Sequence, residues 1–182
     1  ISDIDDIIVV VRESDIPLYE KVLFGYDISY CIGGSTRQES VSNAVETIDS
    51  CDMIIIHDGA RPLVTEKEIL NTLRSAEKYG AAATGVPVKD TIKVIDNNNK
   101  IVDTPKRSSL IAIQTPQIFT FNKYVEAMNC AKMRGKDFTD DCKLLENINE
   151  DVYVVIGDYS NIKITTPDDI PLAESILKLR GE

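Results

Sequence analysis

Charged and polar side chains follow several apolar runs of this chain directly. In open α/β sheets, ligands bind beyond the carboxyl ends of the strands, so residues at these positions are the first candidates for chemistry. Arg or Lys occurs in each of these loops, and Asp58 can contact a metal-bound phosphate or a ribose hydroxyl. Cations beside a carboxylate fit a phosphorylated ligand with Mg²⁺, and ordinary surface loops are the alternative. The loops are Gly33-Gly34-Ser35-Thr36-Arg37, His57-Asp58-Gly59-Ala60-Arg61-Pro62, Lys89-Asp90-Thr91 and Lys163-Ile164-Thr165.

Composition narrows the classes of function. His57 is the only histidine, which excludes a histidine-rich metal site and leaves a single imidazole for acid–base work. We expect it to close a strand and hydrogen-bond its neighbours instead of transferring a proton. The net charge of −10 argues against nonspecific nucleic-acid binding, which needs a basic surface. No apolar run approaches the ~20 residues of a membrane-spanning helix and no secretory signal is visible, so a cytoplasmic protein is expected.

The elements that must position these loops alternate between strands and helices. A β-branched run opens the series at residues 7–11, and Thr65 with Glu68 has capping-box spacing before a helix that ends at Gly80. Alternation of this kind predicts a single domain, residues 1–182, with a three-layer, doubly wound, mostly parallel α/β sheet of Rossmann-like type. Strands are predicted at 7–11, 28–32, 53–56, 82–88, 111–113, 152–156 and 162–164, helices at 16–24, 38–48, 65–79, 122–134, 140–148 and 166–179, and a protruding hairpin at 91–104.

Motifs along the whole chain resemble those of the 2-C-methyl-D-erythritol 4-phosphate cytidylyltransferases, whose fold is that of the nucleotide-diphospho-sugar transferases. His57-Asp58-Gly59-Ala60-Arg61-Pro62 resembles the HD-x-A-R-P segment of that family. Any one motif alone would be weak, but together they occur in family order and at family-like spacing. The others are Gly33-Gly34…Arg37…Ser40-Val41, Val88-Lys89-Asp90-Thr91-Ile92-Lys93, Gln114-Thr115-Pro116-Gln117, Thr139-Asp140-Asp141 and Asn161-Ile162-Lys163-Ile164-Thr165.

The resemblance implies a role for each matched residue. Lys163 and Asp58 would be catalytic, with Lys163 on the α-phosphate and Asp58 next to ribose, metal and acceptor. The metal would be Mg²⁺; its protein ligands are not identified, and Asp58 is a candidate. Residues 88–108 would form an arm that grips a second subunit in a homodimer. Arg61, Thr91, Arg107 and Thr115 would bind the acceptor, while Gly33, Gly34 and Ser40 would hold the cytosine.

Two departures from the family pattern stand out. Ser35 occupies a place where many members have an acidic residue. The strand and the Gly-rich loop with Arg and Lys that open family members have no counterpart before residue 7, and the chain begins with Ile1. We therefore expect an N-terminal portion to be missing from the sequence and the chain as it stands to be catalytically impaired.

The function implied is transfer of CMP from CTP to a sugar-alcohol phosphate, here 2-C-methyl-D-erythritol 4-phosphate, in non-mevalonate isoprenoid biosynthesis. The acceptor's phosphate oxygen is already anionic, so positioning and charge neutralisation suffice for catalysis. Ribitol 5-phosphate is the competing acceptor, although Ala60 and the residue 89–93 motif favour methylerythritol phosphate. Two further hypotheses are a non-catalytic nucleotide-binding protein and a phosphatase with Asp58 as nucleophile. The phosphatase hypothesis is weakened by the absence of DxD spacing around Asp58.

Overall fold

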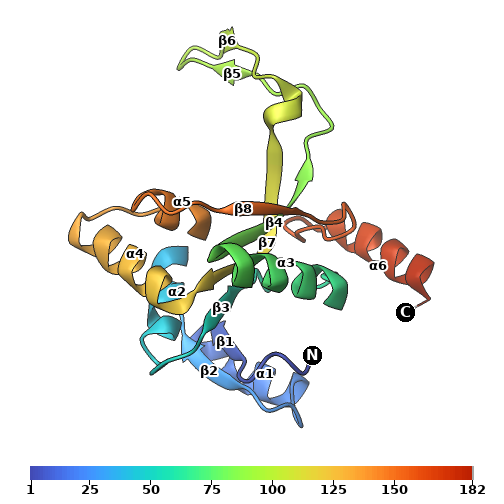
Figure 1. Cartoon of the computed structure of the whole chain (residues 1–182). Coiled ribbons are helices and arrows are strands. Elements are labelled where there is room, and N and C mark those ends of the chain that lie inside the picture. Colours follow the sequence, from blue (N-terminus) through green and yellow to red (C-terminus); the bar gives the residue numbers. More distant parts are fainter. Residues whose placement is uncertain (182) are drawn as a thin grey trace. The chain divides into compact units, whose positions relative to one another are not determined.

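The computed structural model describes residues 1–181 as two compact units (Figure 1). Unit 1 combines residues 1–54 with 120–151, and unit 2 combines residues 55–119 with the chain from 152 onward. Each unit is therefore built from two separate stretches of sequence. That the whole chain is one domain stays a prediction.

Unit 1 contains a parallel pair of strands and helices from both of its stretches. Strand β1 pairs with β2 in a register that places Ile8 opposite Ser29. The core of this unit includes the almost fully buried side chains of Tyr124, Leu144 and Leu145. The elements are β1 (Ile8–Val11), η1 (Glu13–Asp15), α1 (Ile16–Val22), β2 (Ser29–Ile32), α2 (Arg37–Val45), α4 (Phe121–Met133) and α5 (Asp141–Glu146).

Unit 2 contains most of a four-stranded sheet with the order β3-β7-β4-β8. Strand β4 pairs parallel with β8 and antiparallel with β7. Six of its seven residues are buried, which identifies it as the central strand of this unit. The elements are β3 (Met53–Ile56), which spans the boundary between the units, α3 (Glu66–Tyr79), β4 (Ala81–Pro87), β5 (Val94–Ile95), β6 (Ile101–Asp103), η2 (Arg107–Ser109), β7 (Ile111–Thr120), β8 (Tyr153–Ile156) and α6 (Asp169–Arg180).

Local sequence signals explain where helix α3 begins and ends. Thr65 accepts the backbone N–H of Glu68, and the Glu68 carboxylate accepts the backbone N–H of Thr65 at 2.9 Å. This reciprocal capping box satisfies two N–H groups that the first turn leaves open. Gly80 ends the helix with a φ of 89°, a left-handed conformation that costs glycine little. The predicted capping box at Thr65 and the predicted helix end at Gly80 are both confirmed.

The predicted hairpin is also confirmed. Strands β5 and β6 pair antiparallel and lie at the far end of the long ribbons that continue β4 and β7 (Figure 1). Asp96 closes the turn, because its carboxylate accepts the N–H groups of Asn98 and Lys100 at 2.9 and 3.0 Å. The α/β class agrees with the prediction as well: outside the hairpin, the β1–β2 and β4–β8 pairs are parallel and the β4–β7 pair is antiparallel.

Several predicted bounds differ from the structure by a few residues, and three elements differ most. Strand β7 does not stop at Ile113 but continues to Thr120. Residues 162–164 form no strand; a single hydrogen bond from Ile164 N to Ala60 O, 2.8 Å, holds them. Helix α6 begins at Asp169, later than the predicted residue 166, because the Asp169 carboxylate accepts the N–H groups of Thr165 and Thr166.

Candidate functional site

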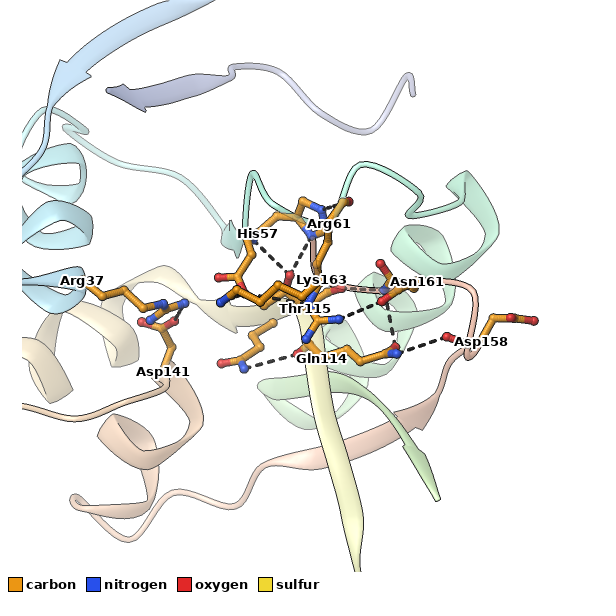
Figure 2. A network of polar contacts seen from close by, with 11 residues as sticks. Arg37, His57, Arg61, Gln114, Thr115, Asp141, Asp158, Asn161 and Lys163 are labelled. Carbon is orange, nitrogen blue, oxygen red and sulfur yellow. Dashed lines mark hydrogen bonds and ion pairs between the residues drawn. The ribbon is translucent and has the colours of Figure 1, made fainter. Parts of the chain in front are cut away.

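Two cationic side chains of unit 2 meet at one carboxylate, that of Asp58. Lys163 Nζ lies 2.9 Å from Asp58 Oδ2, and Arg61 Nε lies 3.8 Å from the same oxygen. Asp58 and Arg61 are mostly covered, with side-chain exposures of 16% and 13%, whereas Lys163 keeps 43% of its side chain exposed. Figure 2 shows the Lys163 side chain extending beside those of Arg61 and Thr115. The sequence-based prediction brought these residues together correctly.

The charge of this cluster favours an anionic ligand. Two cations against one carboxylate leave a formal charge of +1 among Asp58, Arg61 and Lys163. Burial lowers the pKa of Arg61 and the charge of Asp58 opposes that shift, but a guanidinium stays protonated at neutral pH. Because Lys163 is partly exposed, its ammonium can contact a ligand without breaking the fold.

Backbone hydrogen bonds explain why Lys163 reaches Asp58 although the two are far apart in sequence. Arg61 N donates to Asp58 O at 2.9 Å, which folds residues 58–61 into a turn after strand β3. Ile164 N then donates to Ala60 O at 2.8 Å and aligns residues 162–164 with that turn. The side chain of Lys163 is thereby placed beside the Asp58 carboxylate.

Asn161 is a buried residue that hydrogen-bonds to Arg61 and Thr115, and it was not among the predicted site residues. Its carbonyl accepts Arg61 Nη1 at 2.7 Å, and its Nδ2 donates to the Thr115 carbonyl at 2.9 Å (Figure 2). Its side chain also contacts Gln114 Oε1 at 3.4 Å. Asn161 therefore ties the segment that carries Lys163 to strand β7 and to Arg61. Its presence in the matched motif was the only available signal.

The start of the same segment is anchored by helix α3. Asp158 N donates to Glu68 Oε1 at 3.0 Å, so the carboxylate that caps α3 also holds the loop after β8. Gly157 is packed so closely that a Cβ there would lie 2.4 Å from Thr84 Cγ2. Helix α6 adds a further contact through Arg180 Nη2, which donates to Ser160 Oγ at 2.7 Å. The loop that carries the site lysine is thus fixed along its length.

His57 connects two residues of the cluster through hydrogen bonds. Thr115 Oγ1 accepts Asp58 N at 3.0 Å and lies 2.9 Å from His57 Nδ1, while His57 Nε2 lies 3.1 Å from the Arg61 carbonyl. Burial lowers the pKa of His57, although the Arg61 carbonyl, Asp58 and Glu68 act in the opposite direction. The expectation that His57 hydrogen-bonds its neighbours after a strand is confirmed.

The remaining predicted acceptor-binding residues differ in their surroundings. Thr115 is only 3% exposed and its hydroxyl bonds to Asp58 and His57, so contact with a phosphate would require it to turn away from His57. Arg107 is exposed at the base of the hairpin and donates to the Lys89 carbonyl at 3.0 Å. Within residues 1–181, no hydrogen bond or ion pair joins Arg107 or Thr91 to the Asp58 cluster. Their roles stay predictions.

The predicted cytosine-binding residues lie together in unit 1: Gly33 and Gly34 are in the loop between β2 and α2, and Ser40 is in the first turn of α2. Gly34 N donates to Ser40 Oγ at 3.0 Å, and Ser40 Oγ donates to the Thr36 carbonyl at 2.8 Å. A Cβ on Gly33 would lie 3.1 Å from Ser40 Oγ. The two glycines therefore allow the loop to fold closely over the first turn of α2.

The carboxylate of Glu39 hydrogen-bonds to Ser35, the residue that stands where many family members have an acidic one. The backbone N–H of Ser35 donates to Glu39 Oε2 at 2.7 Å, and the Ser35 hydroxyl donates to the same oxygen. These hydrogen bonds lower the pKa of Glu39. The negative charge of Glu39 thus lies beside Ser35, the residue that departs from the family pattern.

Arg37 and Asp141 form a second ion pair that joins the two stretches of unit 1. Arg37 Nη2 lies 2.7 Å from Asp141 Oδ2 (Figure 2). The Tyr124 hydroxyl donates to Asp141 Oδ1 at 2.6 Å. Burial and the neighbouring Asp141 charge raise the pKa of Tyr124, so it stays a neutral donor. Asp140 caps α5 by accepting Lys143 N at 3.0 Å, which confirms that these acids begin a helix.

The part of the chain that the structure describes contains no group of three or more His, Cys, Asp or Glu side chains arranged to hold a metal ion. It also contains no helix long and apolar enough to cross a bilayer.

Comparison with known proteins gives a consistent result. Residues 1–179 match the family described as 2-C-methyl-D-erythritol 4-phosphate cytidylyltransferase. A protein of that name from Clostridium beijerinckii is 47% identical over 179 residues, which cover 96% of this chain and 79% of the relative. The match therefore extends over most of both proteins.

Solved structures agree with the sequence match. The 4-diphosphocytidyl-2C-methyl-D-erythritol synthase of Anaerococcus prevotii has a TM-score of 0.91 at 36% identity, over 97% of this chain and 83% of that one. The 2-C-methyl-D-erythritol 4-phosphate cytidylyltransferase of Thermus thermophilus has a TM-score of 0.85 at 29% identity, over 97% and 84%. These similarities confirm the predicted fold class.

Proposed function

Because the chain belongs to the 2-C-methyl-D-erythritol 4-phosphate cytidylyltransferase family, we propose that its Asp58–Lys163 pair carries the transfer of CMP from CTP to methylerythritol phosphate. The products are 4-diphosphocytidyl-2-C-methyl-D-erythritol and pyrophosphate, on the route to isoprenoids. The observation that supports this assignment best is the 2.9 Å ion pair, which leaves the ammonium of Lys163 partly exposed beside a buried carboxylate.

The chemistry needs no general base. An acceptor phosphate oxygen, already anionic at neutral pH, attacks the α-phosphorus of CTP and forms a new P–O bond. The bond from the α-phosphorus to the bridging oxygen breaks, and its electron pair leaves with pyrophosphate. Negative charge on the α-phosphate oxygens is greatest in the transition state, where Lys163 would neutralise it. Asp58 would hold the ammonium in place before the substrates arrive.

The remaining cluster residues suit binding roles. Arg61 Nε is buried and, among residues 1–181, has no hydrogen-bond partner, although it faces Asp58 at 3.8 Å. The positive charge of the Arg61 guanidinium would attract the acceptor phosphate, while its buried Nε stays beside Asp58. In unit 1, Gly33 and Gly34 of the loop before α2 and Ser40 of its first turn would hold the cytosine, with the Glu39 carboxylate hydrogen-bonded to Ser35 N.

Mg²⁺ would accompany the triphosphate. Magnesium is commonly held by one or two carboxylates together with phosphates and water, and Asp58 is the carboxylate in this cluster. When bound, the ion would offset the charge of the phosphate groups. Chelation with EDTA should abolish turnover and added Mg²⁺ should restore it; unchanged turnover in EDTA would remove the metal from the proposal.

A homodimer through residues 88–108 is part of the proposal. Both hairpin strands expose aliphatic side chains: Ile95, Ile101 and Val102 are 53%, 56% and 55% exposed. Apolar side chains that project together from a fold favour burial against a partner. Sedimentation velocity should give a dimer that dissociates when these three residues are changed to serine. A monomeric wild-type protein would contradict the arm's role.

A cytoplasmic location is also proposed, because CTP and a sugar phosphate are multiply charged and do not cross a bilayer unaided. Enzyme and substrates must therefore share the compartment in which CTP is made. Cell fractionation tests this, and recovery with membranes or outside the cell would contradict it.

Arg107→Ala should raise KM for the acceptor about tenfold or more and leave KM for CTP unchanged, because a charged donor to a phosphate is lost. Arg107 lies exposed at the base of the hairpin, so the fold should be unaffected. Arg74→Ala, at an exposed position of helix α3 outside the arm, is the matched control. Steady-state kinetics with each substrate varied separate the two constants, and an effect confined to CTP would contradict the assignment.

The acceptor itself is tested by comparing kcat/KM for methylerythritol phosphate and ribitol 5-phosphate in the full-length protein. The proposal requires a clear preference for methylerythritol phosphate. Preference for ribitol 5-phosphate would mean that it is the acceptor. Binding of CTP without turnover of either acceptor would support a non-catalytic nucleotide-binding protein.

A further inference from the structure

We propose that His57 is a positioning residue: its neutral imidazole, protonated at Nε2, holds the turn that presents Asp58 and Arg61. The kinetic part of this inference rests on the proposed function. The structural part concerns only which ring nitrogen carries the proton.

The partners of the ring determine the direction of each hydrogen bond. Asp58 N can only donate, so Thr115 Oγ1 accepts this bond at 3.0 Å. The Arg61 carbonyl can only accept, so His57 Nε2 must carry the proton in the 3.1 Å bond between them. His57 Nδ1, 2.9 Å from Thr115 Oγ1, then accepts the hydroxyl proton.

The burial of Thr115 favours this arrangement. Its residue is 3% exposed, and in residues 1–181 its hydroxyl contacts only Asp58 N and His57 Nδ1. A hydroxyl that already accepts from Asp58 needs an acceptor for its own proton, and an unprotonated Nδ1 is the acceptor within reach. The Nε2–H tautomer thus satisfies all three groups at once.

The position of the ring explains why these bonds matter for the site. They hold the N–H of Asp58 at the start of the turn and the carbonyl of Arg61 at its end. Within the same turn, Arg61 N donates to Asp58 O at 2.9 Å. The Asp58 carboxylate, 2.9 Å from Lys163, depends on that turn for its direction. Displacement of catalytic groups by about 1 Å can cost on the order of 10²-fold in rate.

Three substitutions separate positioning from proton transfer and from general stability. His57→Asn keeps a polar atom near Nδ1 for Thr115, His57→Gln keeps a donor near Nε2 for the Arg61 carbonyl, and His57→Phe keeps a ring with neither. We expect kcat of the folded protein to fall about 10-fold or more in the Phe variant, with Asn and Gln between it and wild type. Thermal denaturation gives the folded fraction by which each kcat is corrected.

Two kinetic outcomes would overturn the proposal. Equal corrected kcat values in all variants would mean that the ring only stabilises the fold. Asn and Gln variants as inactive as Phe, with loss of one limb of the pH–rate profile, would mean that His57 transfers a proton.

Nitrogen NMR tests the tautomer without any assay of activity. Because the chain has one histidine, untagged protein labelled with ¹⁵N-histidine gives signals from a single imidazole. At pH 7 and without substrates, Nε2 should be protonated and Nδ1 unprotonated. An Nδ1–H tautomer or an imidazolium would overturn the inference. This readout stands even if the proposed reaction fails, so the two failures are distinguishable.

Discussion

Lys163→Ala is expected to lower kcat by about 10²-fold or more while the protein stays folded. The ammonium lies 2.9 Å from Asp58 and is 43% exposed, so it can reach the α-phosphate of CTP. Its loss removes charge neutralisation that is strongest in the transition state, which lowers kcat more than it raises KM. Steady-state kinetics and thermal denaturation on the same preparations measure both effects.

The folded state should tolerate this change because a partly exposed ion pair contributes only on the order of 0–1 kcal/mol. Lys67→Ala is a suitable control: Lys67 lies exposed on helix α3 of the same unit. Its kcat should equal that of wild type. Near-normal kcat in Lys163→Ala would show that Lys163 does not stabilise the transition state.

Asp58→Asn should also lower kcat by on the order of 10²-fold, by a different route. The amide keeps the shape of the carboxylate but no longer pairs with Lys163 at 2.9 Å or with Arg61 at 3.8 Å. Both cations then lose the group that directs them toward the substrates. The measurement is kcat with saturating CTP and acceptor.

Two comparisons make this result specific. Glu146→Gln breaks a surface ion pair, Lys143–Glu146 at 2.6 Å, in the other unit and should leave kcat unchanged. In the double variant Asp58→Asn with Lys163→Ala, the losses should be less than multiplicative because the two residues act as one unit. Fully multiplicative losses would show that Asp58 and Lys163 act independently.

The Asp58 part of the site was readable from the sequence because it lies just beyond a strand, whereas Lys163 follows no strand directly and was singled out by its matched motif. Asp58 comes immediately after β3, and parallel topology places such loops together at one edge of a sheet. The capping box at Thr65 was readable for a similar reason, since it depends on residues only three positions apart. The specific reaction, by contrast, required the resemblance to a family.

What the sequence did not reveal depends on buried polar contacts between distant segments. Gln114, Thr115 and Gln117 resemble a loop, yet they lie buried within β7, where their neighbours satisfy their polarity. No pattern of residue types or spacing around Asn161 predicts its contacts with Arg61 and Thr115. Residues 162–164 look like a strand because they alternate, but the backbone bond from Ile164 N to Ala60 O and the Lys163–Asp58 ion pair place them without a strand.

The central claim is that this protein joins CMP to the phosphate of methylerythritol phosphate. Phosphorus NMR of the full-length protein with CTP and methylerythritol phosphate tests it most directly, because it identifies the bonds that form and break. We expect coupled signals of a new diphosphate and an equal amount of pyrophosphate. The Lys163→Ala variant should form both products far more slowly. Release of orthophosphate, or CTP left intact beside the acceptor, would contradict it.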